Sequence, residues 1–294
     1  MNNKKFKLNP YWVTDFIDAE GCFFIRLTKN KQYKVGWRVQ RCFQIKLHSR
    51  DMDLLLQVKS FYNDIGYIHK INNNIITYQV CTVNELISII VPHFDKYPLI
   101  TQKQSDFILW SNIVKLMNKS EHLNKDDLMK IINLRASLNK KLSDKLKIYF
   151  PKVIKINRPK INLSININCN WIVGFFTGDG CFYIAIYKSK SNKIDYYVKL
   201  QVLVSQHFRD KLLMNSLVST LECGKVFKRS NENMVDLVVT KFEDINKKII
   251  PLFNKYKIEG IKYLDFQDFC KAIELVKNKA HLTKEDLKKI CRIK

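Results

Sequence analysis

The chain contains an internal duplication, and this feature constrains its fold more than any other. Residues 11–25 read YWVTDFIDAEGCFFI and residues 170–184 read NWIVGFFTGDGCFYI, so tryptophan, phenylalanine, an acid, glycine and cysteine recur in register. The two acids, Glu20 and Asp179, lie 159 positions apart. The same offset joins His48 with His207, Pro92 with Pro251, and His122 with His281. A register kept over half the chain predicts two structurally similar units.

Each copy has the same order of hydrophobic patterns. An apolar helix ends at the acid, alternating segments at 22–30 and 38–46 indicate strands, and a helix at 51–63 precedes two more strands at 66–71 and 75–81. Helices at 103–117 and 125–139 close the first copy. We therefore predict an α+β fold of two pseudo-symmetric αββαββα halves, in which the two apolar helices form a central pair. The predicted halves are 1–141 and 169–294, joined by a linker at 142–168 that contains two prolines.

The charge of the chain points to a polyanionic partner. The 294 residues include 51 Lys and Arg against 27 Asp and Glu, a net charge of +24, which is typical of nucleic-acid-binding proteins. A highly soluble surface and contact with an anionic membrane are the alternative interpretations. No run of about 18 apolar residues is present, so no membrane-spanning helix is predicted.

The eight cysteines are interpreted as small buried hydrophobic residues in a reducing compartment. None of them forms a C-x-x-C pair, so a structural zinc site is not favoured. The matched histidines His122 and His281 stand among residues typical of helix starts, and we interpret them as structural residues.

The position of the two acids suggests a metal site. If the apolar helices pack side by side, Glu20 and Asp179 emerge together at one end, and two neighbouring carboxylates repel unless a cation lies between them. Hard divalent cations, above all Mg²⁺, prefer such oxygen ligands. Two acids that hold metal beside a basic surface suit phosphodiester hydrolysis. The alternative is a structural one, because acids are common at tight turns.

The motifs V-T-D-F-I-D-A-E-G (13–21) and I-V-G-F-F-T-G-D-G (172–180) resemble the paired signatures of single-chain LAGLIDADG homing endonucleases. Segments such as HFDKYPLITQK, QHFRDKLLMNSL and VTKFEDINKKIIP extend the resemblance to the fungal mitochondrial, intron-encoded type. The resemblance implies a monomer with saddle-shaped antiparallel sheets that lie in the major groove of double-stranded DNA. It also implies magnesium-dependent cleavage of both strands at a long, non-palindromic site, and a mitochondrial location.

The resemblance assigns roles to matched positions. It implies metal-binding catalytic acids at Glu20 and Asp179, carbonyl ligands at Ala19 and Gly178, basic residues near the scissile phosphate at Lys103 and Lys262, and a polar residue near the water network at Gln206. Leu47 takes the place of Gln206 in the first copy. The two lysines also fit a plain solvated helix surface. One position departs from the family pattern, because Asp15 stands where the second copy has Gly174.

The strand faces opposite the apolar core and the turn at 70–74 are predicted to read DNA, since Arg, Gln, Asn and Lys suit base edges and phosphates. The predicted DNA-binding residues of the first half are Phe24, Arg26, Thr28, Asn30, Arg38, Gln40, Gln44, Lys46, Lys70 and Asn72. Those of the second half are Tyr183, Tyr187, Ser189, Lys199, Gln201, Ser205, Lys225, Lys228 and Arg229. The two sets differ, so the target is not expected to be a palindrome.

Two other functions stay open on the sequence. An RNA-splicing maturase has the same fold and uses the basic surface to bind an intron, and a catalytically silent DNA binder has the surface without the chemistry. Maturases often lose the acids at the motif ends, and both acids are present here. The sequence therefore favours a DNA-cleaving enzyme.

Overall fold

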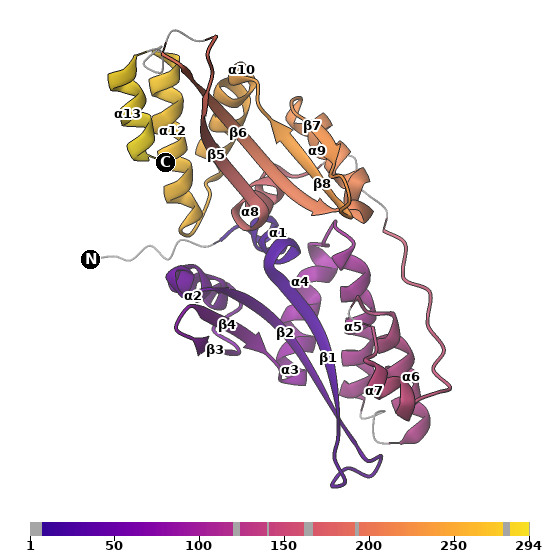
Figure 1. Ribbon diagram of the computed structural model, residues 1–294. Helices are drawn as coiled ribbons and strands as arrows, with labels where there is room; N and C mark the ends of the chain where they lie inside the picture. The colour runs from indigo at the N-terminus through magenta and orange to yellow at the C-terminus, as the bar shows by residue number, and fades with distance from the viewer. Residues whose placement is uncertain are drawn as a thin grey trace, which may run out of the picture. The chain divides into compact units, whose positions relative to one another are not determined.

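The computed structural model describes residues 8–119, 124–139, 141–161, 167–191, 194–278 and 283–293. It contains two compact units, residues 1–163 and 164–294. Each unit has one four-stranded antiparallel sheet, which confirms the predicted α+β class (Figure 1). The matched histidines His122 and His281 lie outside the described residues. The packing of the two motif helices against each other stays a prediction.

The N-terminal unit follows the predicted order and adds helices at its end. Its main elements are α1 (Pro10–Glu20), β1 (Gly21–Lys29), β2 (Trp37–His48), α2 (Met52–Phe61), β3 (Tyr67–Asn72), β4 (Ile75–Val80), α3 (Val83–Glu85), the π-helical turn η2 (Leu86–Ile90), α4 (Val91–Lys96), α5 (Lys103–Asn118), α6 (Lys125–Ser137) and α7 (Asp144–Tyr149). The 3₁₀ turn η1 (Ser49–Asp51) precedes α2. The strand order in the sheet is β1-β2-β4-β3.

The C-terminal unit repeats this arrangement. Its elements are α8 (Cys169–Asp179), β5 (Gly180–Lys188), β6 (Tyr196–His207), the 3₁₀ turn η4 (Phe208–Asp210), α9 (Lys211–Leu221), β7 (Lys225–Lys228), β8 (Met234–Val239), α10 (Phe242–Asp244), η5 (Ile245–Ile249), α11 (Ile250–Tyr256), α12 (Lys262–Lys277) and α13 (Lys284–Ile293). The strand order β5-β6-β8-β7 matches that of the first sheet. The duplication read from the sequence is thus a duplication of topology.

In both units, helices cover one face of the sheet. The ring of Phe23 on β1 packs against the rings of Phe43, Phe94, Phe107 and Trp110. The matching ring of Phe182 on β5 packs against those of Phe253, Phe266 and Phe269. Alternation along each strand sends these rings to the core, so the next residue along the chain points to the opposite face.

Most of the predicted linker makes ordered contacts with the N-terminal unit. Helix α7 lies in this segment, and the ring of Trp37 packs against those of Tyr149 and Phe150. The Arg158 guanidinium donates to an Asp106 carboxylate oxygen at 2.8 Å. The compact units divide after residue 163, so the segment up to that point belongs to the first unit.

The prediction that all cysteines stay free is wrong for two of them. Cys42 on β2 and Cys81, which directly follows β4, form a disulfide. Their backbones are neighbours because Phe43 pairs with Val80 in the ladder between β2 and β4. The other six cysteines are free: Cys22, Cys169, Cys181, Cys223, Cys270 and Cys291.

Within the described residues, no helix has the length and apolar character needed to cross a membrane.

Candidate functional site

Each motif helix ends at its acid, and the following glycine is the first residue of a strand. Helix α1 ends at Glu20 and α8 ends at Asp179. A Cβ atom on Gly21 would lie 2.7 Å from the Ile17 carbonyl oxygen, and one on Gly180 would lie 2.8 Å from a ring carbon of Phe176. Any larger residue would therefore push the strand off the helix end. Glycine is needed here because of this close approach, and φ is negative at both glycines.

The predicted lysine of the N-terminal unit lies at the end of its motif helix. Lys103 begins α5, and its Nζ donates to the carbonyl oxygens of Ile17 and Ala19, each at 3.0 Å. The ammonium group is thus fixed at the last turn of α1, next to the backbone of Glu20. This arrangement joins three residues that the sequence analysis assigned to one site.

Asp18 is a residue of this site that the sequence analysis missed. Its carboxylate accepts hydrogen bonds from the backbone N–H groups of Ile100 (2.8 Å) and Thr101 (3.3 Å) and from the Thr101 hydroxyl. Thr101 Oγ1 in turn accepts from the Lys103 N–H at 3.1 Å. Asp18 therefore ties the end of α1 to the loop that leads into Lys103.

Burial raises the pKa of Asp18 to about 6, although the nearby Lys103 ammonium and the three hydrogen bonds act in the opposite direction. The motif VTDFIDAEG contains three acids, and Asp18 is the second of them. The sequence did offer a signal for Asp18: the first copy has an acid at this position, whereas the second copy has Thr177. Its partner lies 83 residues away in the sequence, so no local pattern predicted the contact.

The C-terminal unit holds its acid differently. Gln206 Nε2 donates to Asp179 Oδ2 at 2.5 Å, so the predicted polar residue contacts the predicted catalytic acid. Lys262 Nζ donates to the Gly180 carbonyl at 2.7 Å. Thr177 Oγ1 donates to the Val173 carbonyl of its own helix at 2.8 Å. Lys262 therefore contacts the backbone just after the acid, while Lys103 contacts the backbone before it.

Asp15, the residue that departs from the family pattern, is buried. Asp15 lies in α1 with none of its surface exposed, and Gly174 of α8 is buried too.

The strand register places most of the predicted DNA-binding residues of the N-terminal unit on the face opposite the core. Phe24, Arg26 and Thr28 pair with Cys42, Gln40 and Arg38, while Gln44 and Lys46 continue the same face of β2. Two residues of this face were missed. Tyr67 donates its hydroxyl to Gln79 Oε1 at 2.9 Å, and Gln79 Nε2 donates to Gln44 Oε1 at 2.9 Å. The alternation in IITYQVC was the available signal for Gln79.

The matching face of the C-terminal unit is more aromatic. Tyr183 pairs with Gln201, Ala185 with Lys199, and Tyr187 with Tyr197. On the other half of this sheet, Ser205 pairs with Asp236 and Lys225 pairs with Val238. Tyr197 and Asp236 were missed by the sequence analysis.

Arg229 and Ser205 form hydrogen bonds with acidic side chains of their own unit. Arg229 makes a two-point contact with Asp236, with its Nε 2.8 Å and its Nη2 2.9 Å from the carboxylate oxygens, and its Nη1 lies 3.2 Å from Glu232. The Ser205 hydroxyl donates to Asp236 at 2.6 Å. Burial alone raises the pKa of Asp236, but the bonds from Arg229 and Ser205 bring this pKa below its usual range.

Two lysines lie on another face than predicted. Lys70 pairs with Ile76 and Lys228 pairs with Val235, and both partners are fully buried. Residues directly opposite in an antiparallel ladder share a face, so the register corrects the placement of both lysines to the core side of their edge strands. Lys228 lies over the ring of Phe208, with its Nζ 5.0 Å from the ring centroid. Three further residues, Asn30, Asn72 and Ser189, lie at or beside hairpin turns.

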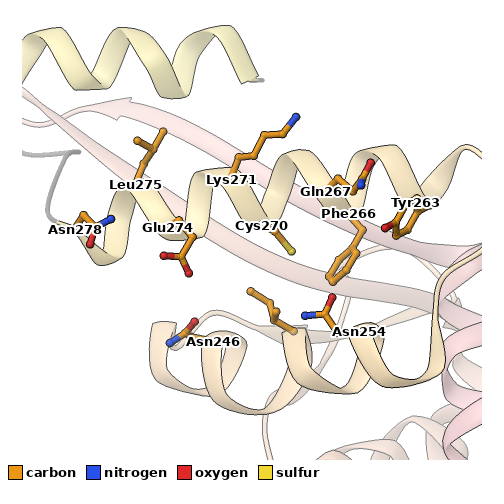
Figure 2. A pocket seen from close by; sticks show the side chains of 11 residues that line it. Asn246, Asn254, Tyr263, Phe266, Gln267, Cys270, Lys271, Glu274, Leu275 and Asn278 are labelled. Atoms are coloured by element: carbon orange, nitrogen blue, oxygen red, sulfur yellow. The ribbon is translucent and has the colours of Figure 1, made fainter.

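The surface has two hollows of interest. One of about 930 Å³ includes Arg26, Arg38, Gln40 and Gln44, so it follows the predicted DNA-binding face of the first sheet. The other, of about 740 Å³, lies on the helical side of the C-terminal unit, where Phe266 and Cys270 of α12 point toward Asn254 of α11 (Figure 2). None of the predicted site residues lines this second hollow.

Comparison with known proteins agrees with this geometry. The family model described as LAGLIDADG endonuclease matches residues 14–114 and 172–273, once in each unit. The chain belongs to the LAGLIDADG endonuclease family. Each match begins inside a motif helix and ends inside the helix that carries the site lysine, α5 or α12.

Similar proteins cover almost the whole chain. A probable intron-encoded endonuclease 2 from Neurospora crassa is 41% identical over 98% of the chain, and a probable intron-encoded endonuclease 3 from the same fungus is 37% identical over 98%. The chain spans 64% and 54% of the lengths of these two relatives.

A solved structure of I-SmaMI bound to an uncleaved DNA target with calcium ions has a TM-score of 0.95 and 42% identity to this chain, and the match covers 98% of both chains. Another structure of I-SmaMI, a LAGLIDADG homing endonuclease, holds cleaved DNA and has a TM-score of 0.96 over 98% of this chain and 96% of that one.

Proposed function

We propose that this protein is a site-specific endonuclease that cuts both strands of double-stranded DNA at a long, non-palindromic target, with Mg²⁺ as its cofactor. The observation that carries the proposal is the repeated arrangement of an acid at the end of a motif helix with a lysine bonded to the adjacent backbone. Family membership and the DNA complexes of I-SmaMI support it.

The donor set fits a hard cation that is shared with the substrate. Glu20 and Asp179 are half-buried, so their carboxylates stay reachable from solvent, and the carbonyls of Ala19 and Gly178 lie one residue before them. Among the described residues there is no cluster of three or more His, Cys, Asp and Glu side chains that would enclose a metal. Mg²⁺ is commonly bound by one or two carboxylates together with substrate phosphate oxygens and water.

The residues of each unit then have separate tasks. The carboxylates of Glu20 and Asp179 would hold the cation, which when bound would supply an activated water and stabilise negative charge on the phosphate. Gln206 orients Asp179 through its amide, and Lys103 and Lys262 place an ammonium group near the negative charge that develops in the transition state. The sheet faces position the duplex through phosphate and base contacts.

The proposal also includes where the protein acts and in what oligomeric state. The curated relatives from Neurospora crassa are intron-encoded, and we propose that this protein acts in mitochondria as a monomer, because one chain carries both units. Its target would lie at the insertion site of an intron.

Neutralising each acid tests the proposal. Glu20→Gln and Asp179→Asn should each lower the single-turnover cleavage rate by about 10³-fold, since removal of one stabilising group commonly costs about 10²- to 10³-fold. DNA affinity should change by less than about threefold, because the phosphate contacts remain. Asp53→Asn in α2 and Asp268→Asn in α12 are matched controls: Asp53 is exposed, and the half-buried Asp268 pairs with Lys271 of its own helix.

The measurement uses a target duplex selected by cleavage from a randomised library, with binding followed separately in the absence of metal. If either acid variant cuts at the wild-type rate with Mg²⁺, the catalytic assignment fails. If the wild-type protein binds a selected duplex but never cuts it, the chain is a DNA-binding protein without nuclease chemistry.

A further inference from the structure

The two units present different chemistry at equivalent positions of their DNA-facing strands. Thr28 pairs with Arg38 at the outer end of the first hairpin, and the matched pair in the second hairpin is Tyr187 with Tyr197. One step inward, Arg26 pairs with Gln40 in the first unit. The matched pair in the second unit is Ala185 with Lys199. Two arginines are thus replaced by an alanine and a tyrosine on the same backbone frame.

The second hairpin carries a flat aromatic surface. The rings of Tyr187 and Tyr197 are stacked, with centroids 5.1 Å apart and an interplanar angle of 22°. The Tyr183 and Tyr187 hydroxyl oxygens are 3.4 Å apart, so a third ring adjoins the pair. Each of these rings is 38% to 42% exposed, while Ala185 between them is almost fully buried. Ordered rings held in this way offer apolar area at little entropic cost on binding.

The first hairpin carries exposed guanidinium groups. Arg26 and Arg38 are both exposed. No ion pair is recorded for either of them within the part of the chain that the structure describes. By contrast, Arg229 of the second unit is occupied by Asp236 and Glu232. Among the described arginines of the predicted DNA-binding set, the two outside ion pairs therefore both lie on the first unit.

These two surfaces suit different bases. In the major groove, guanine presents two acceptors that match an arginine fork, whereas thymine presents a C5-methyl group that makes apolar contacts. We propose that the two units read half-sites of different composition: Arg26 and Arg38 recognise guanines in one half, and the Tyr187–Tyr197 pair recognises thymine methyl groups in the other. This inference rests on the proposed function, because it names the base content of the same DNA target.

The first experiment determines the base composition of the DNA target. Cleavable duplexes selected from a randomised library should be enriched in guanine at outer positions of one half and in thymine at outer positions of the other. Recovery of a cleaved target without this asymmetry overturns the inference and leaves the endonuclease proposal standing. Recovery of no cleaved or specifically bound duplex removes the endonuclease proposal, and this inference with it.

The second experiment removes the methyl groups alone. Deoxyuridine replaces thymidine in one half of the selected target at a time, which keeps base pairing and deletes only the C5-methyl. Affinity should fall about fourfold per contacted methyl, the equivalent of about 0.8 kcal/mol per buried methylene. The loss should occur in one half only.

A double-mutant cycle connects this loss to the tyrosines. In Tyr187→Ala/Tyr197→Ala, the deoxyuridine substitution should have no further effect, because the contact is already absent. Tyr187→Phe/Tyr197→Phe keeps the rings and should retain the full effect. In the matched variant Arg26→Ala/Arg38→Ala, deoxyuridine should cost as much as in the wild type, while replacement of guanine by 7-deazaguanine in the other half should no longer matter.

Three results overturn the inference. They are an unchanged affinity with deoxyuridine, additive effects of deoxyuridine and the alanine pair, or a phenylalanine variant as weak as the alanine variant. The last result would assign the contact to the hydroxyl groups. Circular dichroism melting of each variant distinguishes a local loss of contact from a failure to fold.

Discussion

The two units have the same backbone fold, but they differ in the contacts that orient their site residues. In the first, Asp18 ties the motif helix to the loop before Lys103. In the second, Thr177 bonds within its own helix and Gln206 holds Asp179 instead. Duplication has therefore kept the acid and the lysine in place, while the groups that position them have diverged. If both units cleave DNA as proposed, their two rates need not be equal.

The largest expected difference concerns the Cys42–Cys81 disulfide, which the second unit lacks because Gln201 and Thr240 occupy the matched positions. The bond links residues 39 apart, and closing a loop of this length stabilises a fold by about 3 to 4 kcal/mol on the chain-entropy account. Reduction should lower the free energy of unfolding of the oxidised protein by about this amount. Urea titrations with and without dithiothreitol measure it.

Cys42→Ser/Cys81→Ser is the matched variant for this prediction. It should show the reduced stability under both conditions. A wild-type protein equally stable with and without reductant would contradict the prediction.

The second prediction concerns Asp18. Asp18→Ala should release the loop that positions Lys103 and slow cleavage of one DNA strand by about 100-fold, since misplacement of a catalytic group by about 1 Å has an effect of this size. Cleavage of the other strand should change by less than about threefold. Single-turnover assays with each strand labelled separately measure the two rates.

The matched variant in the second unit is Thr177→Ala, which should stay within about twofold for both strands, because Thr177 bonds only its own helix. Asp18→Asn retains a carbonyl acceptor for the Ile100 N–H and should recover part of the lost rate. Equal slowing of both strands by Asp18→Ala would mean that Asp18 has a general structural role.

The third prediction separates the units by acid sensitivity. Burial lowers the pKa of His93 to about 4, and Leu252 stands at the matched position of the second unit. A histidine with a depressed folded pKa contributes stability that is present above its unfolded pKa of about 6.5 and is lost as the pH falls toward 4. The expected loss is on the order of 2 kcal/mol.

Denaturant titrations at several pH values measure this loss in the wild type and in His93→Leu. The variant should lose less stability than the wild type between pH 6.5 and 4. Parallel pH profiles would show that His93 is not responsible.

The smallest expected effect comes from exchanging the residues at one matched position, Leu47 of the first unit and Gln206 of the second. Gln206→Leu gives the second unit the residue of the first and should slow cleavage of one strand by about tenfold, because Asp179 loses the hydrogen bond from the Gln206 amide. Leu47→Gln makes the reverse change and should leave the first strand within about threefold, since Asp18 and Lys103 already order that site. A tenfold gain from Leu47→Gln would instead show that the first site lacked an orienting group.

Much of the fold and part of the site could be predicted from local patterns. Apolar residues at every second position placed Phe23 and Phe182 in the cores and Arg26 and Tyr183 on the opposite faces. The repeated motif located Glu20 and Asp179, the resemblance to the family pointed to Lys103, and the offset between the copies pointed from Lys103 to Lys262. Lys70, which was assigned to a turn, and Lys228 lie on the short edge strands β3 and β7, where no clear alternation indicates the face, and β3 contains a register shift between Lys70 and Asn72.

By itself, the sequence determined that there are two copies of one unit, which residues end the motif helices, and which faces of the long strands lie away from the core. These are properties of spacing, and spacing is local. Only the tertiary structure decided that Asp18 binds Thr101, that Cys42 meets Cys81, and that Asp236 occupies Arg229. Each of these contacts depends on which segments the sheet and helices bring together, and hydrophobic periodicity carries no information about the partner across that distance.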